Sequence, residues 1–320
     1  MKRRQLVVPL AVAAALGVLA APARANTFPA KTIRVIVPYA AGGVVDVQAR
    51  AVIQTMAEIL KAPIAVEARP GASGSIAAEA VANAAADGYT LMVSASFINS
   101  APLMESNLRW STKSFTPVGR FSLSPSYFVV PATSPARTVK EFVEFAKKST
   151  RRLQYANGGN GTPQQISTEL FARAAGITMD PVMYKGAPPS VPDLINGLTD
   201  MTVLPSTVAH PQVSGGKLRA LANMSNNRSI HLPDVPTIAE AGFPEATVLS
   251  WYGLHAPAGT PAEVIRVLEA AMQQACASNE VKQRLMTAGG ESAFLGVRDF
   301  TAFLARDTQQ WANVVKLIAK

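Results

Sequence analysis

The sequence predicts an α/β protein of two domains, each built on a mainly parallel sheet that is flanked by helices. Its 320 residues exceed the length of one typical domain, which is about 150 residues. Strand-like, glycine-rich and helix-like segments alternate along the chain, as in parallel sheets covered by helices. Apolar residues make up 48% of the chain and charged residues only 16%, so an intrinsically disordered chain is excluded.

The first unit opens with an apolar strand. Residues 32–38 are rich in β-branched side chains and nearly continuous in apolar ones, as expected of a strand buried on both faces. Gly42 and Gly43 follow this strand, and Asp46 then lies near the start of a predicted helix. The unit continues with a predicted strand at 64–67, a helix at 76–85 and a strand at 89–93.

A second unit repeats this order. Strands are predicted at residues 128–131, 153–156 and 218–222. Thr138 and Glu141 form a capping box, which predicts a helix between the first two of these strands. After the second strand, Thr162 suits the N-cap of a helix that ends before Gly176.

The chain is then expected to return to the first unit. Residues 251–257 predict a strand, and three helices are predicted to begin at Thr260, at Ser278 and near residues 298–300. We expect the chain to cross between the domains near Ser124 and Leu249. The boundaries are then 26–125 and 251–320 for a discontinuous first domain and 126–250 for the second.

Residues 1–25 are predicted to be a signal peptide. Lys2, Arg3 and Arg4 precede an apolar, alanine-rich run, and the triplet from Ala23 to Ala25 provides the small residues that a signal peptidase reads. We expect cleavage after Ala25 and a periplasmic location. A membrane anchor is the alternative, because the run is nearly long enough to span a bilayer. The paired arginines leave the export route open between the general and twin-arginine pathways.

The charge balance favours a small anionic ligand. Removing residues 1–25 takes away four basic residues and no acid, so the net charge falls from +9 to +5. No cluster of lysines and arginines tracks a phosphate backbone, which argues against nucleic acid as a partner. With the single cysteine Cys276 and three scattered histidines, the chain has no intramolecular disulfide and no predicted metal site or cofactor.

Two glycine-rich loops are the predicted ligand-binding site. Each follows a strand and opens a helix, so unpaired backbone N–H groups and the helix dipole can hold an anion without a basic side chain. If the loops face one cleft from different domains, they can clamp one carboxylate; the alternative is that the glycines only make turns. The residues are Tyr39, Ala40, Ala41, Gly42, Gly43 and Asp46 in the first loop, and Asn157, Gly158, Gly159, Asn160, Gly161 and Thr162 in the second.

Sequence signatures of enzymes are missing. Neither a phosphate-binding P-loop nor a nucleophile elbow occurs in the sequence. His210, His231 and His255 have no partner at helical spacing. Asp46 could act as a general base, but its place near a helix start favours a capping or loop-bracing role. We therefore predict no catalytic residues.

The sequence resembles the tripartite tricarboxylate transporter receptors, also called Bug-type extracytoplasmic solute receptors, over nearly the whole chain after residue 25. The matching motifs are Pro38-Tyr-Ala-Ala-Gly-Gly-x-x-Asp46, Glu67-x-Arg-Pro-Gly71, Asp87-Gly-Tyr-Thr-Leu91, Phe115-Thr-Pro-Val118, Tyr184-Lys-Gly-Ala187, Gly216-Lys-Leu-Arg-Ala-Leu-Ala222, Leu232-Pro-Asp-Val-Pro-Thr237, Glu240-Ala-Gly242 and Ala256-Pro-Ala-Gly-Thr-Pro261. The resemblance implies a two-domain periplasmic binding protein fold, in which both glycine loops give backbone N–H groups to a ligand carboxylate. It also implies delivery of the ligand to a membrane permease, without catalysis.

Three residues depart from the family pattern. Leu204 stands where members often carry an acidic residue, and Val44 and Val45 stand where a hydroxyl is common. Because buried polar ligand groups would lack partners there, we hypothesise a less polar carboxylate, aromatic or a hydrophobic diacid. The alternative is that these residues lie outside the contact shell.

Two other functions stay open. The fold could serve a receptor that presents its ligand to a sensor, or the protein could be an exported hydrolase of small anionic molecules. Ligand turnover would identify the hydrolase, whereas reversible binding with domain closure identifies the receptor. We expect a monomer, because a receptor that opens and closes needs no partner subunit.

Overall fold

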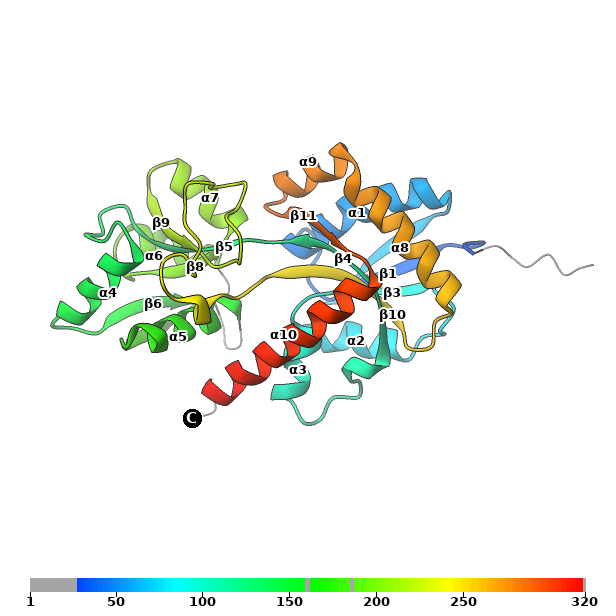
Figure 1. Cartoon of the computed structure of the whole chain (residues 1–320), viewed down its shortest axis with the longest axis horizontal. Helices are drawn as coiled ribbons and strands as arrows, with labels where there is room; N and C mark the ends of the chain where they lie inside the picture. Colours follow the sequence, from blue (N-terminus) through cyan, green and yellow to red (C-terminus); the bar gives the residue numbers. More distant parts are fainter. Residues whose placement is uncertain (1–27, 159–161, 185–186, 319–320) are drawn as a thin grey trace, which may run out of the picture.

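Two α/β lobes lie side by side along the long axis of the molecule (Figure 1). The computed structural model describes residues 28–158, 162–184 and 187–318. The predicted signal peptide and its cleavage site lie outside these residues. Within them, no helix combines the length and the apolar character that a membrane-spanning helix needs.

The first lobe contains a six-stranded sheet in the order β11-β4-β10-β3-β1-β2. Its strands are β1 (Ile33–Val37), β2 (Ile64–Ala68), β3 (Thr90–Ser94), β4 (Phe115–Leu123), β10 (Trp251–Pro257) and β11 (Glu291–Leu295). Its helices are α1 (Val44–Leu60), α2 (Ser75–Ala82), α3 (Phe97–Met104), α8 (Ala262–Ala277), α9 (Asn279–Thr287) and α10 (Val297–Ile318). One continuous hydrophobic core joins the sheet to α1, α2, α3 and α8.

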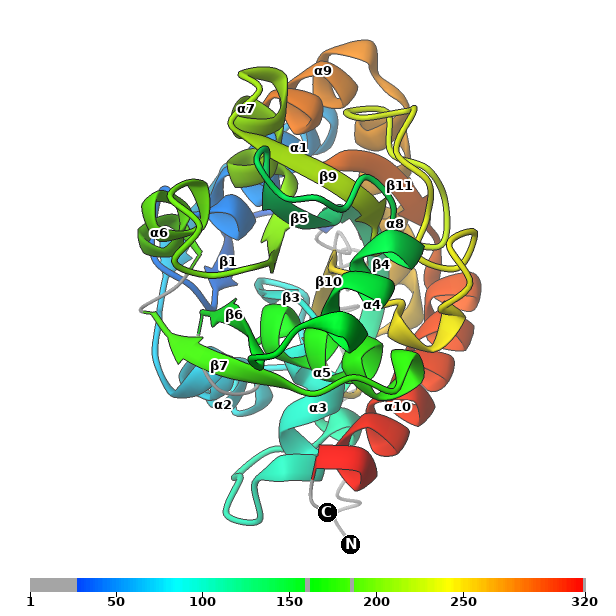
Figure 2. The same ribbon diagram turned by 90° about the vertical axis from the view of Figure 1, so that its left-hand side faces the viewer.

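The second lobe contains a three-stranded sheet in the order β8-β5-β9 and the parallel pair β6-β7 (Figure 2). Its strands are β5 (Ser126–Pro131), β6 (Leu153–Asn157), β7 (Met179–Met183), β8 (Thr202–Pro205) and β9 (Leu218–Asn223). Its helices are α4 (Val139–Lys148), α5 (Pro163–Ala175), α6 (Val191–Ile195) and α7 (Ser206–Ser214). A parallel bridge between Tyr155 and Met201 connects the two sets of strands.

Local sequence signals explain where the main helices begin and end. The Thr138 hydroxyl accepts a hydrogen bond from the Glu141 N–H at 3.1 Å, as the predicted capping box requires. The Thr162 hydroxyl caps α5 in the same way, and Gly176 ends that helix with a left-handed φ of 62°. Both glycine-loop helices predicted from the sequence, α1 and α5, are present.

The α/β class is confirmed, but the sheets are more mixed than predicted. In the first lobe β1 pairs in parallel with β2 and β3, whereas β10 runs antiparallel to both of its neighbours, β3 and β4. β10 is antiparallel because the chain enters it from the second lobe, and it therefore runs in the opposite direction to β3 and β4. In the second lobe β5 is antiparallel to β8 and β9.

Two chain crossings connect the lobes, and they lie next to each other. The Ser124 N–H donates to the Ser250 carbonyl at 2.8 Å, between the end of β4 and the start of β10. These crossings lie where the sequence predicted them. β4 of the first sheet ends at Leu123, and the next strand of that sheet, β10, begins at Trp251. We propose that the two lobes are the two predicted domains.

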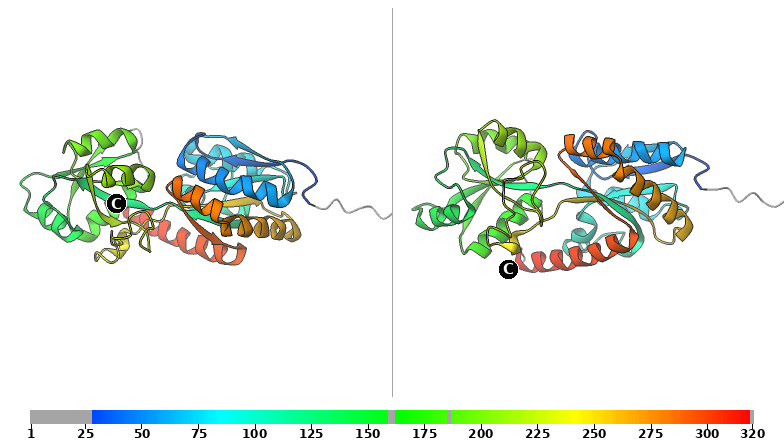
Figure 3. Two further views of the ribbon diagram at one scale, coloured as in Figure 1. Left: turned by 90° about the horizontal axis from the view of Figure 1, so that it is seen from above. Right: turned by 45° about the horizontal axis from the view of Figure 1, so that its top comes forward.

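The helix α10 is a further connection, because it runs from the first lobe to the second (Figure 3). Near its start, the Phe300 ring lies 5.4 Å from the ring of Trp251 in β10. Near its end, Trp311 and Val314 belong to the hydrophobic core of the second lobe. The Gln310 side-chain amide donates to the Thr247 carbonyl at 2.6 Å. The predicted assignment of the whole segment 251–320 to one domain therefore misses that α10 packs on both lobes.

A buried acid fastens α10 to the first lobe. Asp307 is only 6% exposed, and one of its carboxylate oxygens accepts a hydrogen bond from the Asn99 amide of α3 at 2.7 Å. Burial raises the pKa of Asp307 to about 6, although the hydrogen bond from Asn99 acts in the other direction.

The substitution Asp307→Asn should stabilise the protein at neutral pH. A folded-state pKa of about 6 lies above the ordinary 3.8, so the acid destabilises the fold when ionised, and this penalty disappears as pH falls from 6 toward 4. We expect a gain in unfolding free energy of about 2 kcal/mol at pH 7 that shrinks toward pH 4, measured by urea denaturation. The exposed Asp299→Asn is the control and should show no such gain; an equal effect in both variants would contradict the assignment.

Candidate functional site

A cavity of about 540 Å³ lies between the two lobes. Tyr39 contributes to it from the first glycine loop, Thr162 from the second, and Trp311 from α10. The complete lining is Tyr39, Val45, Ser73, Ala95, Ser96, Phe97, Ser100, Ala101, Met104, Glu105, Thr162, Ser250, Trp251, Tyr252 and Trp311. Both predicted loops therefore border one cavity, from opposite lobes.

The first glycine loop connects β1 to α1 and is closed by its own hydrogen bonds. The Gly42 N–H donates to a carboxylate oxygen of Asp46 at 2.9 Å, and the Gly43 N–H donates to the Ala40 carbonyl at 3.1 Å. Gly42 has a φ of 77°, in the left-handed region that glycine adopts without strain. Ala40, Ala41 and Gly42 are exposed, whereas their neighbours Tyr39 and Val45 line the cavity.

Asp46 braces this loop, as its position near the helix start predicted. Its side chain is buried, and its oxygens accept hydrogen bonds from the Gly42 N–H and, at 2.9 Å, from the Arg50 guanidinium. Burial opposes ionisation of this carboxyl, but the hydrogen bonds from Arg50 and Gly42 outweigh it and lower the pKa. Asp46 is therefore an anion whose charge is used inside the protein, and it does not line the cavity.

The start of α1 can attract an anion. The first-turn N–H groups of an α-helix have no hydrogen-bond partner within the helix. Just before α1, the N–H groups of Gly42 and Gly43 are already bound to Asp46 and to the Ala40 carbonyl. The N–H groups at Val44 and Val45 therefore remain at the end of a 17-residue helix, where the dipole places a partial positive charge. Val45 is also a wall of the cavity, so this end of the helix is adjacent to the ligand space.

The second glycine loop is described in part. Asn157 ends β6 and is fully buried, with its carbonyl accepting the Tyr184 N–H at 2.8 Å. Gly158 is partly buried, and Thr162 lies both at the N-cap of α5 and in the cavity wall. Gly159, Asn160 and Gly161 lie outside the described residues, so their predicted contact with a ligand stays a prediction.

Leu204 lies in a hydrophobic cluster and not in the described cavity wall. Its side chain is fully buried in a hydrophobic cluster with Tyr127, Val129 and Leu194, and it is not among the residues that line the cavity. The predicted ligand contact at Leu204 stays a prediction, and the argument for an apolar ligand rests more directly on Val45.

Sequence reasoning missed most of the cavity wall. Phe97, Met104 and Glu105 come from α3 and its end, and Trp311 comes from the far end of the chain. The aromatic and apolar content of these segments could have marked them as buried, but not as neighbours. Among the described lining residues, Glu105 is the one charged side chain, and none is a lysine or arginine.

Hydroxyl groups supply polar contacts in the cavity. Burial raises the pKa of Tyr252 to about 12 and raises that of Tyr39 even further above its ordinary value, so both phenols keep their protons. Together with Ser96, Ser100 and Ser250, they give the wall neutral groups that can donate hydrogen bonds to a carboxylate.

A serine and a histidine are hydrogen-bonded, but inside the sheet. The Ser94 hydroxyl lies 2.7 Å from Nδ1 of His255, and the two residues are 0% and 2% exposed. Burial lowers the pKa of His255 to about 3. Neither residue lines the cavity, so a ligand there could not reach this pair. No group of three potential metal-ligating side chains occurs in the described part of the chain.

Comparison with known proteins gives one consistent result. A profile of the family described as tripartite tricarboxylate transporter family receptor (TctC) matches residues 48–319. Protein BugT of Bordetella pertussis (strain Tohama I) is 33% identical over 324 residues, which cover 99% of this chain and 98% of BugT.

Two solved structures show similar folds. MatC (Rpa3494) from Rhodopseudomonas palustris with bound malate is 31% identical and has a TM-score of 0.73, covering 90% of this chain and 100% of that one. The R. palustris protein Rpa4515 with adipate is 29% identical and has a TM-score of 0.78, covering 91% and 98%.

The substitution Asp46→Ala should destabilise the first glycine loop. It leaves the partly buried hydrogen bond of the Gly42 N–H without its acceptor and Arg50 without its partner, for which we expect a loss of about 1–3 kcal/mol in unfolding free energy at pH 7. Because the pKa of Asp46 is lowered, this contribution is present above pH 4 and fades as the carboxyl is protonated below it.

Asp46→Asn is the matched control, measured in the same urea series. Its amide oxygen can still accept the Gly42 N–H but cannot pair with the charge of Arg50. An intermediate loss is expected. Wild-type stability in Asp46→Ala at pH 7 would contradict a bracing role.

Proposed function

The chain belongs to the tripartite tricarboxylate transporter receptor family, and we propose that it captures a small carboxylate between its two lobes and delivers it to a membrane permease of that transporter class. Its fold is that of a periplasmic binding protein, which suits reversible capture of a solute. Members of this family are solute-binding receptors.

One observation carries this proposal: the starts of α1 and α5, from opposite lobes, border the same cavity. Val45 lies in the first turn of α1, and Thr162 is the N-cap of α5. Both helices direct the positive ends of their dipoles toward this region, which favours an anion. Because no basic side chain is found among the described lining residues, backbone N–H groups and hydroxyls would hold the charge.

The ligand is a carboxylate with an apolar body, aromatic or a hydrophobic diacid. Val45, Phe97, Met104 and Trp251 give the cavity extended apolar surface, against which such a body can be buried. Glu105 would repel a second negative charge brought close to it, so the second carboxylate of a diacid would have to lie away from Glu105. The similar proteins MatC and Rpa4515, solved with malate and adipate, support a carboxylate as the ligand class.

The proposed location of the protein is the periplasm. Receptors of this family are periplasmic, and the predicted removal of residues 1–25 would release the chain from Asn26 onward. A monomer is sufficient for the proposed function, because both halves of the cavity come from one chain.

The proposal is tested by thermal unfolding of the chain from Asn26 against a panel of small carboxylates and their uncharged amides. The protein is first unfolded in urea, dialysed and refolded, which removes any co-purified ligand. A bound acid at one hundred times its dissociation constant should add about 2.7 kcal/mol, a shift of several degrees.

The panel also tests the receptor function and the apolar ligand class separately. Hits among aromatic or aliphatic acids, without hits among their amides, are the expected result. Hits confined to amino or hydroxy acids would keep the receptor function and contradict the apolar ligand class. If no acid changes the unfolding temperature, the receptor function itself is contradicted.

A further inference from the structure

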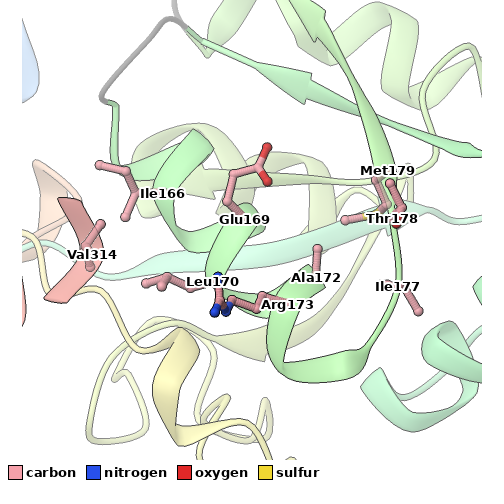
Figure 4. A pocket seen from close by; sticks show the side chains of 9 residues that line it. All are labelled: Ile166, Glu169, Leu170, Ala172, Arg173, Ile177, Thr178, Met179 and Val314. Atoms are coloured by element: carbon pink, nitrogen blue, oxygen red, sulfur yellow. The ribbon is translucent and has the colours of Figure 1, made fainter. Parts of the chain in front are cut away.

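Three hollows lie in a row at the end of α10, and they share wall residues. The cavity between the lobes shares Trp311 with a small hollow of about 10 Å³. That hollow shares Ile166 and Val314 with a groove of about 310 Å³ along α5. In this groove, Ile166 and Val314 lie together at one end and Ile177 and Thr178 at the other (Figure 4). Trp311 is thus the wall residue that the ligand cavity shares with the hollow in the second lobe.

The position of Trp311 is fixed from both sides. The preceding residue, Gln310, is hydrogen-bonded to the Thr247 carbonyl at 2.6 Å, and Val314 one turn later is 4% exposed in the core of the second lobe. On the first-lobe side, Asp307 is hydrogen-bonded to Asn99 of α3 at 2.7 Å. Trp311 itself is 5% exposed, so its indole is packed rather than free to swing aside.

The part of the cavity wall that includes Trp311 is built from the same two helices. α3 contributes Phe97, Ala101 and Met104 to the cavity, and α10 contributes Trp311. Because the hydrogen bond between Asn99 and Asp307 holds α3 against α10, the lining side chains of these two helices keep a set position relative to each other. A ligand body that extends through the cavity to this part of the wall therefore meets a packed indole.

We propose that Trp311 is the specificity-determining residue that limits the length of the apolar body of the ligand. The inference rests on the proposed carboxylate-receptor function. Shorter acids fit in front of the indole, whereas longer ones collide with it. A smaller side chain at this position would join the cavity to the hollow behind it, because the backbone of α10 is held on both sides and cannot collapse fully into the gap.

The test compares acids of increasing length on wild type, Trp311→Ala, Trp311→Leu and Trp311→Phe. The probes are straight-chain monocarboxylates from butanoate to decanoate and the corresponding ω-phenyl acids, with dissociation constants measured by calorimetry. The ratio of affinities, longest to shortest acid, should rise at least tenfold in Trp311→Ala over wild type. In Trp311→Leu and Trp311→Phe this ratio should rise by less than in Trp311→Ala, and least in Trp311→Phe, which keeps the largest side chain.

Val314→Ala is the matched control. Val314 lies on the same helix and in the same core, but it borders the hollow and the groove and not the ligand cavity. It should lower the unfolding temperature without changing the ranking of the acids. Should Trp311→Ala fail to fold, the Leu and Phe variants still report the ranking.

The outcomes are distinct. An unchanged ranking in all foldable Trp311 variants would overturn the inference while leaving the receptor function in place. An equal change of ranking in Val314→Ala would overturn it as well, because general loosening of the lobe would then be the cause. A wild-type protein that binds none of the acids, on this series and on the carboxylate panel, would overturn the proposed function first.

Discussion

The arrangement of the site depends on how the two chain crossings are held together. The Ser124 N–H and the Ser250 carbonyl join the crossings by one hydrogen bond, between a strand that leaves the first sheet and a strand that returns to it. Because both lobes extend from this pair, the starts of α1 and α5 are brought to the same cavity from opposite sides. α10 adds a connection outside the crossings, with Phe300 packed in one lobe and Trp311 in the other.

In the proposed function, this geometry would attract an anion with little fixed charge in the cavity. Asp46 and Arg50 neutralise each other within the first loop, and the charge of Asp46 serves to hold the Gly42 N–H. What faces the cavity is a helix end, together with neutral hydroxyls such as that of Tyr252. Such a site is preorganised, so little entropy is lost when a ligand is bound. We propose that the apolar wall then decides which carboxylates fit.

The sequence identified the elements whose signals are local. The capping box at Thr138 and the glycines after β1 and β6 all predicted structure through short-range chemistry. Contacts between distant segments could not be predicted in this way. Nothing near Trp311 in the sequence indicates that it lines the same cavity as Phe97, and the mixed sheet order follows from where the chain returns. For Leu204, alignment with a family position predicted a ligand contact, but it did not predict that the side chain packs in a hydrophobic cluster of the second lobe.

The central claim is that helix starts, not basic side chains, bind the carboxylate of the ligand. The most direct measurement is calorimetric binding of the best acid and of its methyl ester, which has nearly the same shape but no charge. The ester is expected to bind about one hundred times more weakly, a loss near 2.7 kcal/mol, because charge-assisted hydrogen bonds to the anion are lost. Equal affinity for acid and ester would contradict this claim, since the site would then recognise only the apolar body.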